Sequence, residues 1–569
     1  MNRLFAFALL CVVWSAAVHA APPVVLLRSD TTAAFFLANG GDYERILTPW
    51  RSLFARHGIK AQEMPAEQLA SLKQPAVLVL ASTAALGDAE RDAIRSRLAA
   101  GWSVLGTWGV GVRDGKGGWT GYDFIDEVFA ARVAPELAPA KDERFLLPFG
   151  ETPLTHALPA GKRIYLLPTN EPLLRVHARN AAARFGNYMR DATLPGALLG
   201  AAAFDERDGA RRAYFGFAET TWDSAQADLD AMLLGTLDWL GRKPIVMKSA
   251  WPHPHQAALL LEMDTEDKFE NSVRFAAVLE RFGIRGTFYS LTSEAIRYPN
   301  VVKRLASRHE IAYHAEVHTG FAKLARKQQD ERLKSMIKQM SRLLPDASAA
   351  TGFRAPLEEY DATTEELLRA NGLRHHAASP AARDDMLPGF SSAEPGLPSD
   401  KALVVLPRTW HDDIKLFTTG LLKGAPAEQM LLASLQDTLA MRGFGLLSLH
   451  TQQFYAGSVM ERATPRLLES VANHGDQIWT APGEEIARWW RDREAVQILA
   501  RDREGELHIQ LKVARQVKRV KLVLIAPDAR PPQLEAGADI ARVEKLDAYR
   551  WAIVLPELRE GDSELRIRF

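Results

Sequence analysis

Short apolar runs bounded by Gly, Pro or charged residues recur along most of the chain, with amphipathic stretches between them. Such continuous runs are typical of buried parallel strands, whose sheet is covered on both faces. The stretches 42–58 and 88–101 have helical periodicity, and Asp88 is expected to cap the second. The alternation predicts an open, doubly wound α/β domain over residues 21–243. Its clearest expected strands occupy residues 23–29, 75–82 and 102–108.

A longer alternation of the same kind fills residues 257–490. Helical periodicity appears at 301–309 and 326–344, between apolar runs. Repeated βα units of this size predict a parallel barrel or a distorted barrel, whose chemistry belongs at the C-terminal ends of the strands. The expected strands occupy residues 257–264, 286–291, 310–314, 351–355, 373–379, 403–407 and 445–450.

The two ends of the chain have different patterns. Residues 495–569 alternate or run apolar between Pro, Gly and Asp breaks, which predicts a small antiparallel β-sandwich. Its expected strands occupy residues 508–514, 518–527, 549–556 and 564–569. Residues 244–256, which contain Pro and His, predict a linker. Residues 1–20 place a basic residue before a short apolar run and a small-residue cleavage site, as a secretory signal peptide does.

Composition narrows the function classes. The 569 residues are 47% hydrophobic and 25% charged, and 70 basic residues balance 70 acidic ones, so net charge favours no nucleic-acid partner. The single cysteine, Cys11, lies in the expected signal peptide, which leaves the mature chain without a disulfide or a cysteine nucleophile. The signal predicts a periplasmic or secreted protein with no membrane span after cleavage.

Two histidines four residues apart, His314 and His318, suggest a metal site. The zinc-protease signature H-E-x-x-H is absent, because Ala315 follows the first histidine and Glu316 comes one position late. Glu316 is therefore expected at the surface or behind the ligands rather than among them. The spacing alone leaves the question of a metal open.

Residues at the expected ends of other strands add candidate groups to this pair of histidines. Asp264, Arg354 and His450 are each expected at the C-terminal end of a strand, and Glu266 shares the face of Asp264 because side chains alternate along a strand. One carboxylate and two histidines are a common ligand set for a divalent metal that keeps positions open. Amide hydrolysis needs a polarised carbonyl, a base and an acid. These residue types can supply all three.

Several segments of the central region match, in order, the motifs of one enzyme family. They are residues 264–266, 281–290, 299–318, 354–356 and 447–450. Residues 256–455 thereby resemble the NodB-homology polysaccharide deacetylases, carbohydrate esterase family four, which implies a NodB-type distorted (β/α) barrel. The resemblance further implies that Asp264 is the general base, Arg354 orients it, and His450 is the general acid.

The same resemblance implies that Glu266, His314 and His318 bind a divalent metal, with Zn²⁺ as the first expectation and Co²⁺, Ni²⁺ or Fe²⁺ as alternatives. A carboxylate that orients His450 is expected at Asp412 or Asp413. Nearby, Trp410 is either a wall of the sugar-binding groove or a core residue, and Pro356 belongs to the Arg-x-Pro motif beside the substrate.

Three positions depart from the family pattern. Glu266 stands where the ligand is usually Asp, Ala315 replaces a common Ser or Thr, and Leu357 replaces a common Tyr whose backbone N–H helps to hold the oxyanion. A backbone donor survives a change of side chain. These departures leave the substrate open, and a degenerate enzyme that has lost its activity stays an alternative.

The leading hypothesis is a metal-dependent hydrolase that removes N-acetyl groups from an exopolysaccharide or cell-wall glycan. The alternatives are an O-acetyl esterase, a non-sugar amidase, or a catalytically dead glycan-binding protein. Residues 21–243, through 212–217, are similar to glutamine-amidotransferase-like domains, but without a cysteine nucleophile they are expected to be non-catalytic. The modular layout is similar to exopolysaccharide-modifying deacetylases, which makes exopolysaccharide export machinery an expected partner beside the acetylated polysaccharide.

Overall fold

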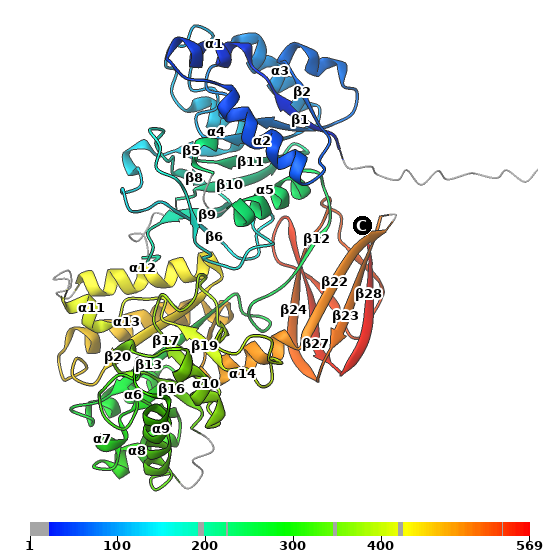
Figure 1. Cartoon of the computed structure of the whole chain (residues 1–569). Helices are drawn as coiled ribbons and strands as arrows, with labels where there is room; N and C mark the ends of the chain where they lie inside the picture. The colour runs from blue at the N-terminus through cyan, green and yellow to red at the C-terminus, as the bar shows by residue number, and fades with distance from the viewer. Residues whose placement is uncertain are drawn as a thin grey trace, which may run out of the picture.

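The computed structural model of the protein describes residues 22–191, 199–222, 226–344, 350–418, 425–503, 505–537 and 539–569. Three units pack against one another: an N-terminal α/β unit, a central unit built on a curled sheet, and a C-terminal pair of β-sheets (Figure 1). The expected signal peptide, with Cys11, lies outside the described residues. None of the helices in the described ranges has the length and apolar character needed to cross a membrane.

The N-terminal unit contains a nine-stranded sheet whose first five strands are parallel and whose last four are antiparallel. The strand order is β2 (Ala61–Met64), β1 (Val24–Leu27), β3 (Val77–Leu80), β4 (Ser103–Thr107), β11 (Ala210–Phe215), β10 (Ala202–Arg207), β9 (Ala181–Gly186), β6 (Phe145–Pro148) and β7 (Ile164–Tyr165). A separate two-stranded ribbon joins β5 (Ala131–Val133) to β8 (Val176–Ala178). The predicted doubly wound part is therefore extended by an antiparallel part that carries the sheet toward the central unit.

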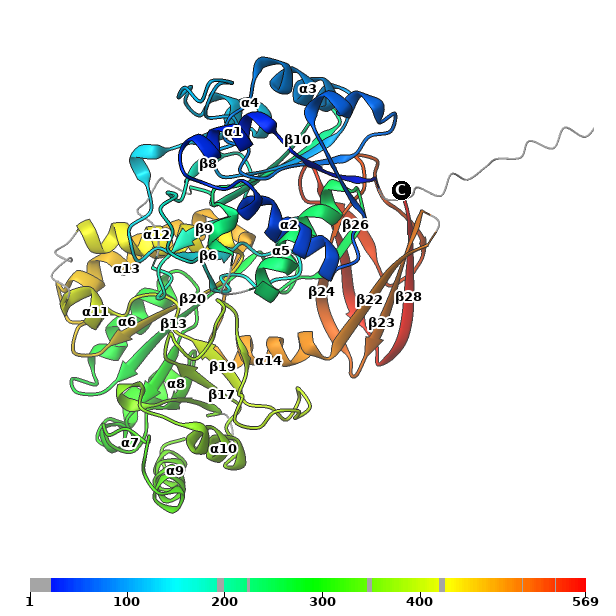
Figure 2. The ribbon, with the colours of Figure 1, turned by 45° about the horizontal axis from the view of Figure 1, so that its top comes forward.

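Helices cover both faces of this sheet (Figures 1 and 2). They are α1 (Asp30–Ala38), α2 (Glu44–Arg56), α3 (Asp88–Ala99), α4 (Asp123–Phe129) and α5 (Gln226–Leu240). The expectation that Asp88 caps α3 is wrong, because Gly87 is the N-cap and Asp88 is the first helical residue. The Glu90 carboxylate accepts the Gly87 backbone N–H at 2.8 Å, so the chain satisfies this donor from inside the helix.

The central unit contains a curled sheet of parallel strands, with one antiparallel strand at its edge. Its order is β18 (Gly389–Phe390), β19 (Val404–Pro407), β17 (His375–Ala378), β16 (Gly352–Arg354), β15 (Glu310–Tyr313), β14 (Thr287–Ser290), β13 (Ala257–Thr265) and β20 (Phe444–His450), with β21 (Ile478–Thr480) paired to the start of β13. Each expected strand of residues 257–450 is present, and β18 and β21 are additional. The fold class predicted from the sequence, a distorted barrel between an α/β domain and a β-sandwich, is confirmed.

The helices of the central unit follow the strands in βα order. They are α6 (Asn271–Arg281), α7 (Thr292–Ala295), α8 (Pro299–Ala306), α9 (Arg326–Met340), α10 (Ala362–Ala370), α11 (Asp413–Thr418), α12 (Ala425–Met441), α13 (Val459–Asn473) and α14 (Gly483–Glu494). The loop after β19 links to β20 at the open side of the barrel. There the Thr409 hydroxyl donates to the Phe444 carbonyl at 2.7 Å and accepts the Leu446 N–H at 3.0 Å.

The C-terminal unit consists of two four-stranded sheets that pack face to face. One sheet has the order β12 (Ile245–Lys248), β24 (Val517–Ile525), β27 (Arg550–Leu558) and β26 (Arg542–Lys545), and the other has β22 (Val496–Arg503), β23 (Glu506–Val513), β28 (Gly561–Arg568) and β25 (Gln533–Ala536). Strand β12 comes from the stretch expected to be a linker. Its Ile245 and Met247 alternate into the apolar core, so this stretch pairs with β24 instead of crossing solvent.

A buried ion pair joins the N-terminal unit to the central one. The Arg184 guanidinium on β9 donates from Nε and Nη2 to the Asp437 carboxylate on α12, both at 2.7 Å, and both side chains are buried. Two buried charges offset their desolvation only while both are present and well oriented. The contact therefore fixes α12 against the sheet edge of the N-terminal unit.

We expect Asp437→Ala to lower the free energy of unfolding by about 3–5 kcal/mol, because it leaves the Arg184 cation buried without its partner. The double variant Arg184→Met/Asp437→Leu should lose much less, since no charge remains to be desolvated. Urea denaturation of the full chain measures both. The exposed pair between Arg95 and Glu127 is the control, and Glu127→Ala should cost less than about 1 kcal/mol. Equal losses in the single and double variants would contradict this account.

Candidate active site

The predicted site residues come together at the C-terminal ends of four strands of the curled sheet. Asp264 lies near the end of β13, Arg354 is the last residue of β16, and His450 is the last residue of β20. Glu266 follows β13 directly, and His314 follows β15. The parallel register pairs Asp264 with His450 across β13 and β20. Each of these side chains is buried.

The two histidines converge on a single carboxylate oxygen. Glu266 Oε1 lies 3.0 Å from His314 Nε2 and 2.9 Å from His318 Nε2. His318 is about two-fifths exposed, whereas His314 is buried. Ala315 takes a left-handed φ of 73°, which turns the chain directly after His314 and lets His318 return to the same oxygen. The ligand atoms of these three residues all lie within 4.8 Å of one another.

The protonation of His314 tests whether this set fits a cation. Its Nδ1 lies 3.0 Å from the Arg354 carbonyl oxygen, which accepts only, so Nδ1 carries the hydrogen. In the neutral ring, Nε2 then presents a lone pair to Glu266 Oε1 at 3.0 Å, and two acceptors face each other. Either a second proton or a metal ion removes this conflict. Histidine ligands commonly donate their other N–H to a backbone carbonyl, so the arrangement fits a metal.

Arg354 joins the buried carboxylates behind this set. Its Nε donates to Asp264 Oδ2 at 2.8 Å, and its Nη1 lies 3.0 Å from Glu262 Oε1. Burial raises the pKa of Glu262 to about 8, against the opposing effect of the Arg354 cation. Asp264 Oδ1 is buried and has no hydrogen-bond partner among the described residues. This oxygen is therefore free to accept a proton or a further ligand.

His450 is held by Asp413, one of the two candidates from the sequence. Its Nδ1 donates to Asp413 Oδ1 at 2.6 Å, and its backbone N–H donates to Asp413 Oδ2 at 2.7 Å. Its Nε2 lies 3.5 Å from Asp264 Oδ2 and so faces the site. Burial opposes the charged ring, yet the Asp413 carboxylate raises the pKa of His450 to about 9. The other candidate, Asp412, lies 3.1 Å from Arg408 Nη1 and accepts from the Lys415 backbone.

Glu266 is held as an anion. Burial opposes its ionisation, but the adjacent His314 ring and the Gln452 amide lower the pKa of Glu266 to about 2. The Gln452 amide donates to its Oε2, and the Thr451 hydroxyl accepts its backbone N–H at 3.1 Å. The sequence reasoning missed Gln452. The sequence feature that could have indicated Gln452 is its position two residues after His450, in the loop that follows the same strand.

The remaining expected residues lie around this centre. Trp410 is a core residue, not a groove wall: it is buried, and its indole N–H donates to Thr438 Oγ1 at 2.9 Å. Pro356 is buried at the start of a short helical turn. The next residue, Leu357, has a left-handed φ of 60° and a side chain that is 63% exposed. This left-handed backbone is strained for a residue other than glycine, so the position of Leu357 beside the site has a cost in conformational energy.

Two further residues, Glu358 and Arg408, were not expected from the sequence. Glu358 Oε1 accepts from Arg354 Nη2 at 3.3 Å and from Arg408 Nε at 2.8 Å. Glu316, between the two histidines, pairs with Arg332 Nε at 2.6 Å and takes no part in the carboxylate–histidine set. This agrees with its expected place behind the ligands.

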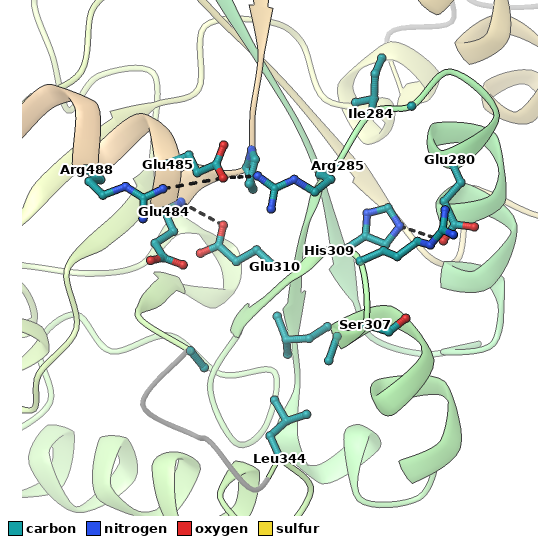
Figure 3. A pocket seen from close by; sticks show the side chains of 16 residues that line it. Glu280, Ile284, Arg285, Ser307, His309, Glu310, Leu344, Glu484, Glu485 and Arg488 are labelled. Carbon is teal, nitrogen blue, oxygen red and sulfur yellow. Dashed lines mark hydrogen bonds and ion pairs between the residues drawn. The ribbon is translucent and has the colours of Figure 1, made fainter. Parts of the chain in front are cut away.

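A cavity lies at the opposite ends of the barrel strands. It has a volume of about 640 Å³ and is lined by residues at the starts of β14 and β15 and by α14 (Figure 3). Most of its charged groups have partners: Glu485 pairs with Arg285 and Arg488, His309 with Glu280, and Glu310 accepts the Glu484 backbone N–H. No residue of the carboxylate–histidine set lines it.

Comparison with known proteins finds one family model that matches part of the central unit. The polysaccharide deacetylase family model matches residues 255–376, which include Asp264, Glu266, both histidines and Arg354. No curated protein matches. The matched range leaves out residues 21–243, so the glutamine-amidotransferase-like resemblance stays a prediction.

Solved structures that match part of this chain include the following three. A protein named as a polysaccharide deacetylase from Mycobacterium smegmatis is 23% identical over 45% of this chain and 98% of its own, with a TM-score of 0.37. One from Pseudomonas aeruginosa is 18% identical over 44% of this chain and 95% of its own, with a TM-score of 0.37. Puue allantoinase is 19% identical over 43% of this chain and 93% of its own, also with a TM-score of 0.37.

We expect Asp413→Asn to lower the pKa of His450 from about 9, because the ring loses its closest counter-charge while burial still opposes the charged form. Histidine ring NMR on metal-free protein measures this, with His450→Gln to assign the signal. The folded-state pKa lies above the unfolded value of 6.5. The ion pair therefore stabilises the fold fully below pH 6.5, and this contribution is lost as the pH rises through about 9. An unchanged His450 titration in the variant would contradict the assignment.

Proposed function

We propose that this protein, whose residues 255–376 match the polysaccharide deacetylases, is a metal-dependent hydrolase that removes N-acetyl groups from a polysaccharide outside the cytoplasm. The observation that carries the proposal is the convergence of His314 Nε2 and His318 Nε2 on Glu266 Oε1, beside Asp264 and His450. This arrangement combines a ligand set with a separate acid and base. The extracytoplasmic location rests on the signal-peptide pattern of residues 1–20.

The proposed roles follow from the contacts of each side chain. Glu266, His314 and His318 hold a divalent cation, which supplies Lewis acidity toward water and the acyl oxygen. Asp264 keeps Oδ1 free while Arg354 fixes its other oxygen, so it is the group placed to take a proton from the attacking water. His450, charged through Asp413, faces the site with Nε2 and is placed to protonate the leaving nitrogen.

An open rim supports a polymeric substrate. Val317, Leu357 and Tyr455 lie on loops that follow β15, β16 and β20, and their side chains are 45%, 63% and 51% exposed. Large exposed apolar side chains on separate loops around one site are typical of a surface that binds a partner. A sugar chain that runs across the strand ends would contact these side chains while one acetyl group enters the centre.

Acetate release from acetylated glycans tests the function. We expect release from N-acetylated chitooligomers to stop on exhaustive chelation, because the chelator removes the cation. It should return with Zn²⁺ or Co²⁺, which the ligands bind in their deprotonated forms. Simple aryl acetates in parallel separate an amidase from an O-acetyl esterase. Metal binding without acetate release from any substrate would support a dead glycan-binding protein instead. Full activity after verified metal loss would refute the mechanism.

Two substitutions separate the base from the ligand. Asp264→Asn should keep the metal yet slow turnover at least ~10²-fold, the low end of a general base's contribution. Glu266→Gln should lose the metal, because the substitution removes the only negatively charged ligand and leaves the two neutral histidines. Metal stoichiometry by elemental analysis decides between them. Glu316→Gln is the matched control, since Glu316 lies between the histidines but pairs with Arg332. If Asp264→Asn loses the metal and Glu266→Gln keeps it, the two roles must be exchanged.

A further inference from the structure

A second cavity lies where the three units meet, away from the candidate active site. It has a volume of about 240 Å³, the room of about eight water molecules in the liquid. Its walls come from the loop after β6, the turn between β8 and β9, the end of α12, and the start of β27. Those elements belong to the N-terminal, central and C-terminal units, which adjoin in both views of the molecule (Figures 1 and 2).

Positive charge exceeds negative charge around this cavity. Three arginines line it: Arg179, Arg442 and Arg550. The nearest carboxylates are already engaged, because Glu151 Oε2 lies 3.5 Å from Arg442 and Asp547 Oδ2 accepts from Arg550 Nε at 2.8 Å. Lys521 adds a further buried cation next to Glu151. Burial and the neighbouring Arg550 lower the pKa of Arg442, the effect expected of a cation that lacks enough counter-charge.

Arg179 distinguishes this cavity from the larger one. It is exposed in the turn between β8 and β9, and within the described ranges its guanidinium makes no hydrogen bond or ion pair. The next residue, Asn180, also lines the cavity; its carbonyl oxygen accepts the Phe204 N–H at 3.0 Å, and its side-chain amide makes no hydrogen bond within the described part of the chain. In the larger cavity, by contrast, four glutamates outnumber three arginines, and Arg285 and Arg488 both pair with Glu485. Free donors and excess charge together define an anion-binding surface.

Apart from Thr152, whose hydroxyl pairs with that of Thr155 at 2.6 Å, the other side chains of the walls are apolar or aromatic. Phe149, Ala440 and Tyr549 line the cavity beside the arginines. A site for a bare inorganic ion needs no such walls, whereas small-molecule sites combine apolar lining with a few convergent polar groups. The volume and the lining therefore suit an anion with an organic body.

We propose that this three-unit cavity binds a small organic anion, with a carboxylate or phosphate group on a sugar-sized body. The anionic group contacts Arg179, Arg442 and Asn180, and the body lies against Phe149 and Tyr549. The site is separate from the acetyl-binding centre. Arg442 precedes β20 and His450 ends it, so the strand places the two sites about 20 Å apart.

Calorimetric titration of the full chain at constant ionic strength tests the proposal with four probes: glucuronate, glucose 6-phosphate, glucose and inorganic phosphate. We expect glucuronate or glucose 6-phosphate to bind and glucose not to bind. Inorganic phosphate should bind more weakly than the organic anions, since it cannot use the apolar walls. The two organic anions distinguish a carboxylate site from a phosphate site.

Arg179→Gln is the informative variant, because an exposed and unpaired side chain can be changed without disturbing the fold. We expect it to weaken the binding of the organic anion at least ~10-fold, the scale of one charge-assisted hydrogen bond. Arg45→Gln is the matched control, since Arg45 is exposed on α2 of the same unit and outside the cavity. Circular dichroism and thermal melting without ligand verify that both variants fold.

Each result decides the proposal. It is overturned if neither organic anion binds at about 1 mM, a weak affinity for a site of this kind. It is also overturned if Arg179→Gln binds as tightly as the unchanged protein, or if inorganic phosphate binds as tightly as the organic anions. None of these outcomes depends on acetate release, so they test the cavity independently of the proposed hydrolase activity.

Discussion

The buried guanidinium of Arg354 is the interaction on which the candidate site depends. Its side chain contacts the carboxylates of Glu262, Asp264 and Glu358, while its carbonyl oxygen accepts the Nδ1 hydrogen of His314. Carboxylates this close and this buried would repel one another or take up protons without a counter-charge. One residue thus supplies a counter-charge to Asp264 and fixes the tautomer of His314. The buried carboxylates and the carboxylate–histidine set cannot be positioned independently.

Parallel strand ends bring these groups together. In a curled parallel sheet the last residues of all strands meet at one edge, so residues far apart in the sequence become neighbours. Asp264 and His450 are 186 residues apart yet lie side by side in the β13–β20 register. Glu266 and His318 extend the set from the loops just beyond that edge. Ala315 and Leu357 have left-handed backbone conformations, so the loops that lead to the site contain backbone strain.

The sequence was sufficient to predict the central strands and which of the candidate residues lie at their C-terminal ends, because apolar runs mark buried strands and polar residues follow them, but it did not predict Gln452, Glu358 or Arg408. It could not choose between Asp412 and Asp413, since the choice depends on which of the two carboxylates at the start of α11 faces β20. The same limit applied to Trp410, whose burial depends on packing across the open side of the barrel. Strand β12 was missed because its partner β24 lies more than 250 residues later along the chain. Long-range partners leave no local signal.

Units without candidate catalytic residues still support strand β20, which carries His450. At its beginning, the Met441 carbonyl accepts the Gly150 N–H of the N-terminal unit at 2.9 Å. Along α12, the helix before it, Asp437 is fixed by Arg184. Near its end, Asp191 of the N-terminal unit lies 3.1 Å from His411, two residues before Asp413. The N-terminal unit therefore contacts the chain just before β20 and the loop that leads to Asp413, the partner of His450. These contacts give the N-terminal unit a physical reason to be attached to the barrel.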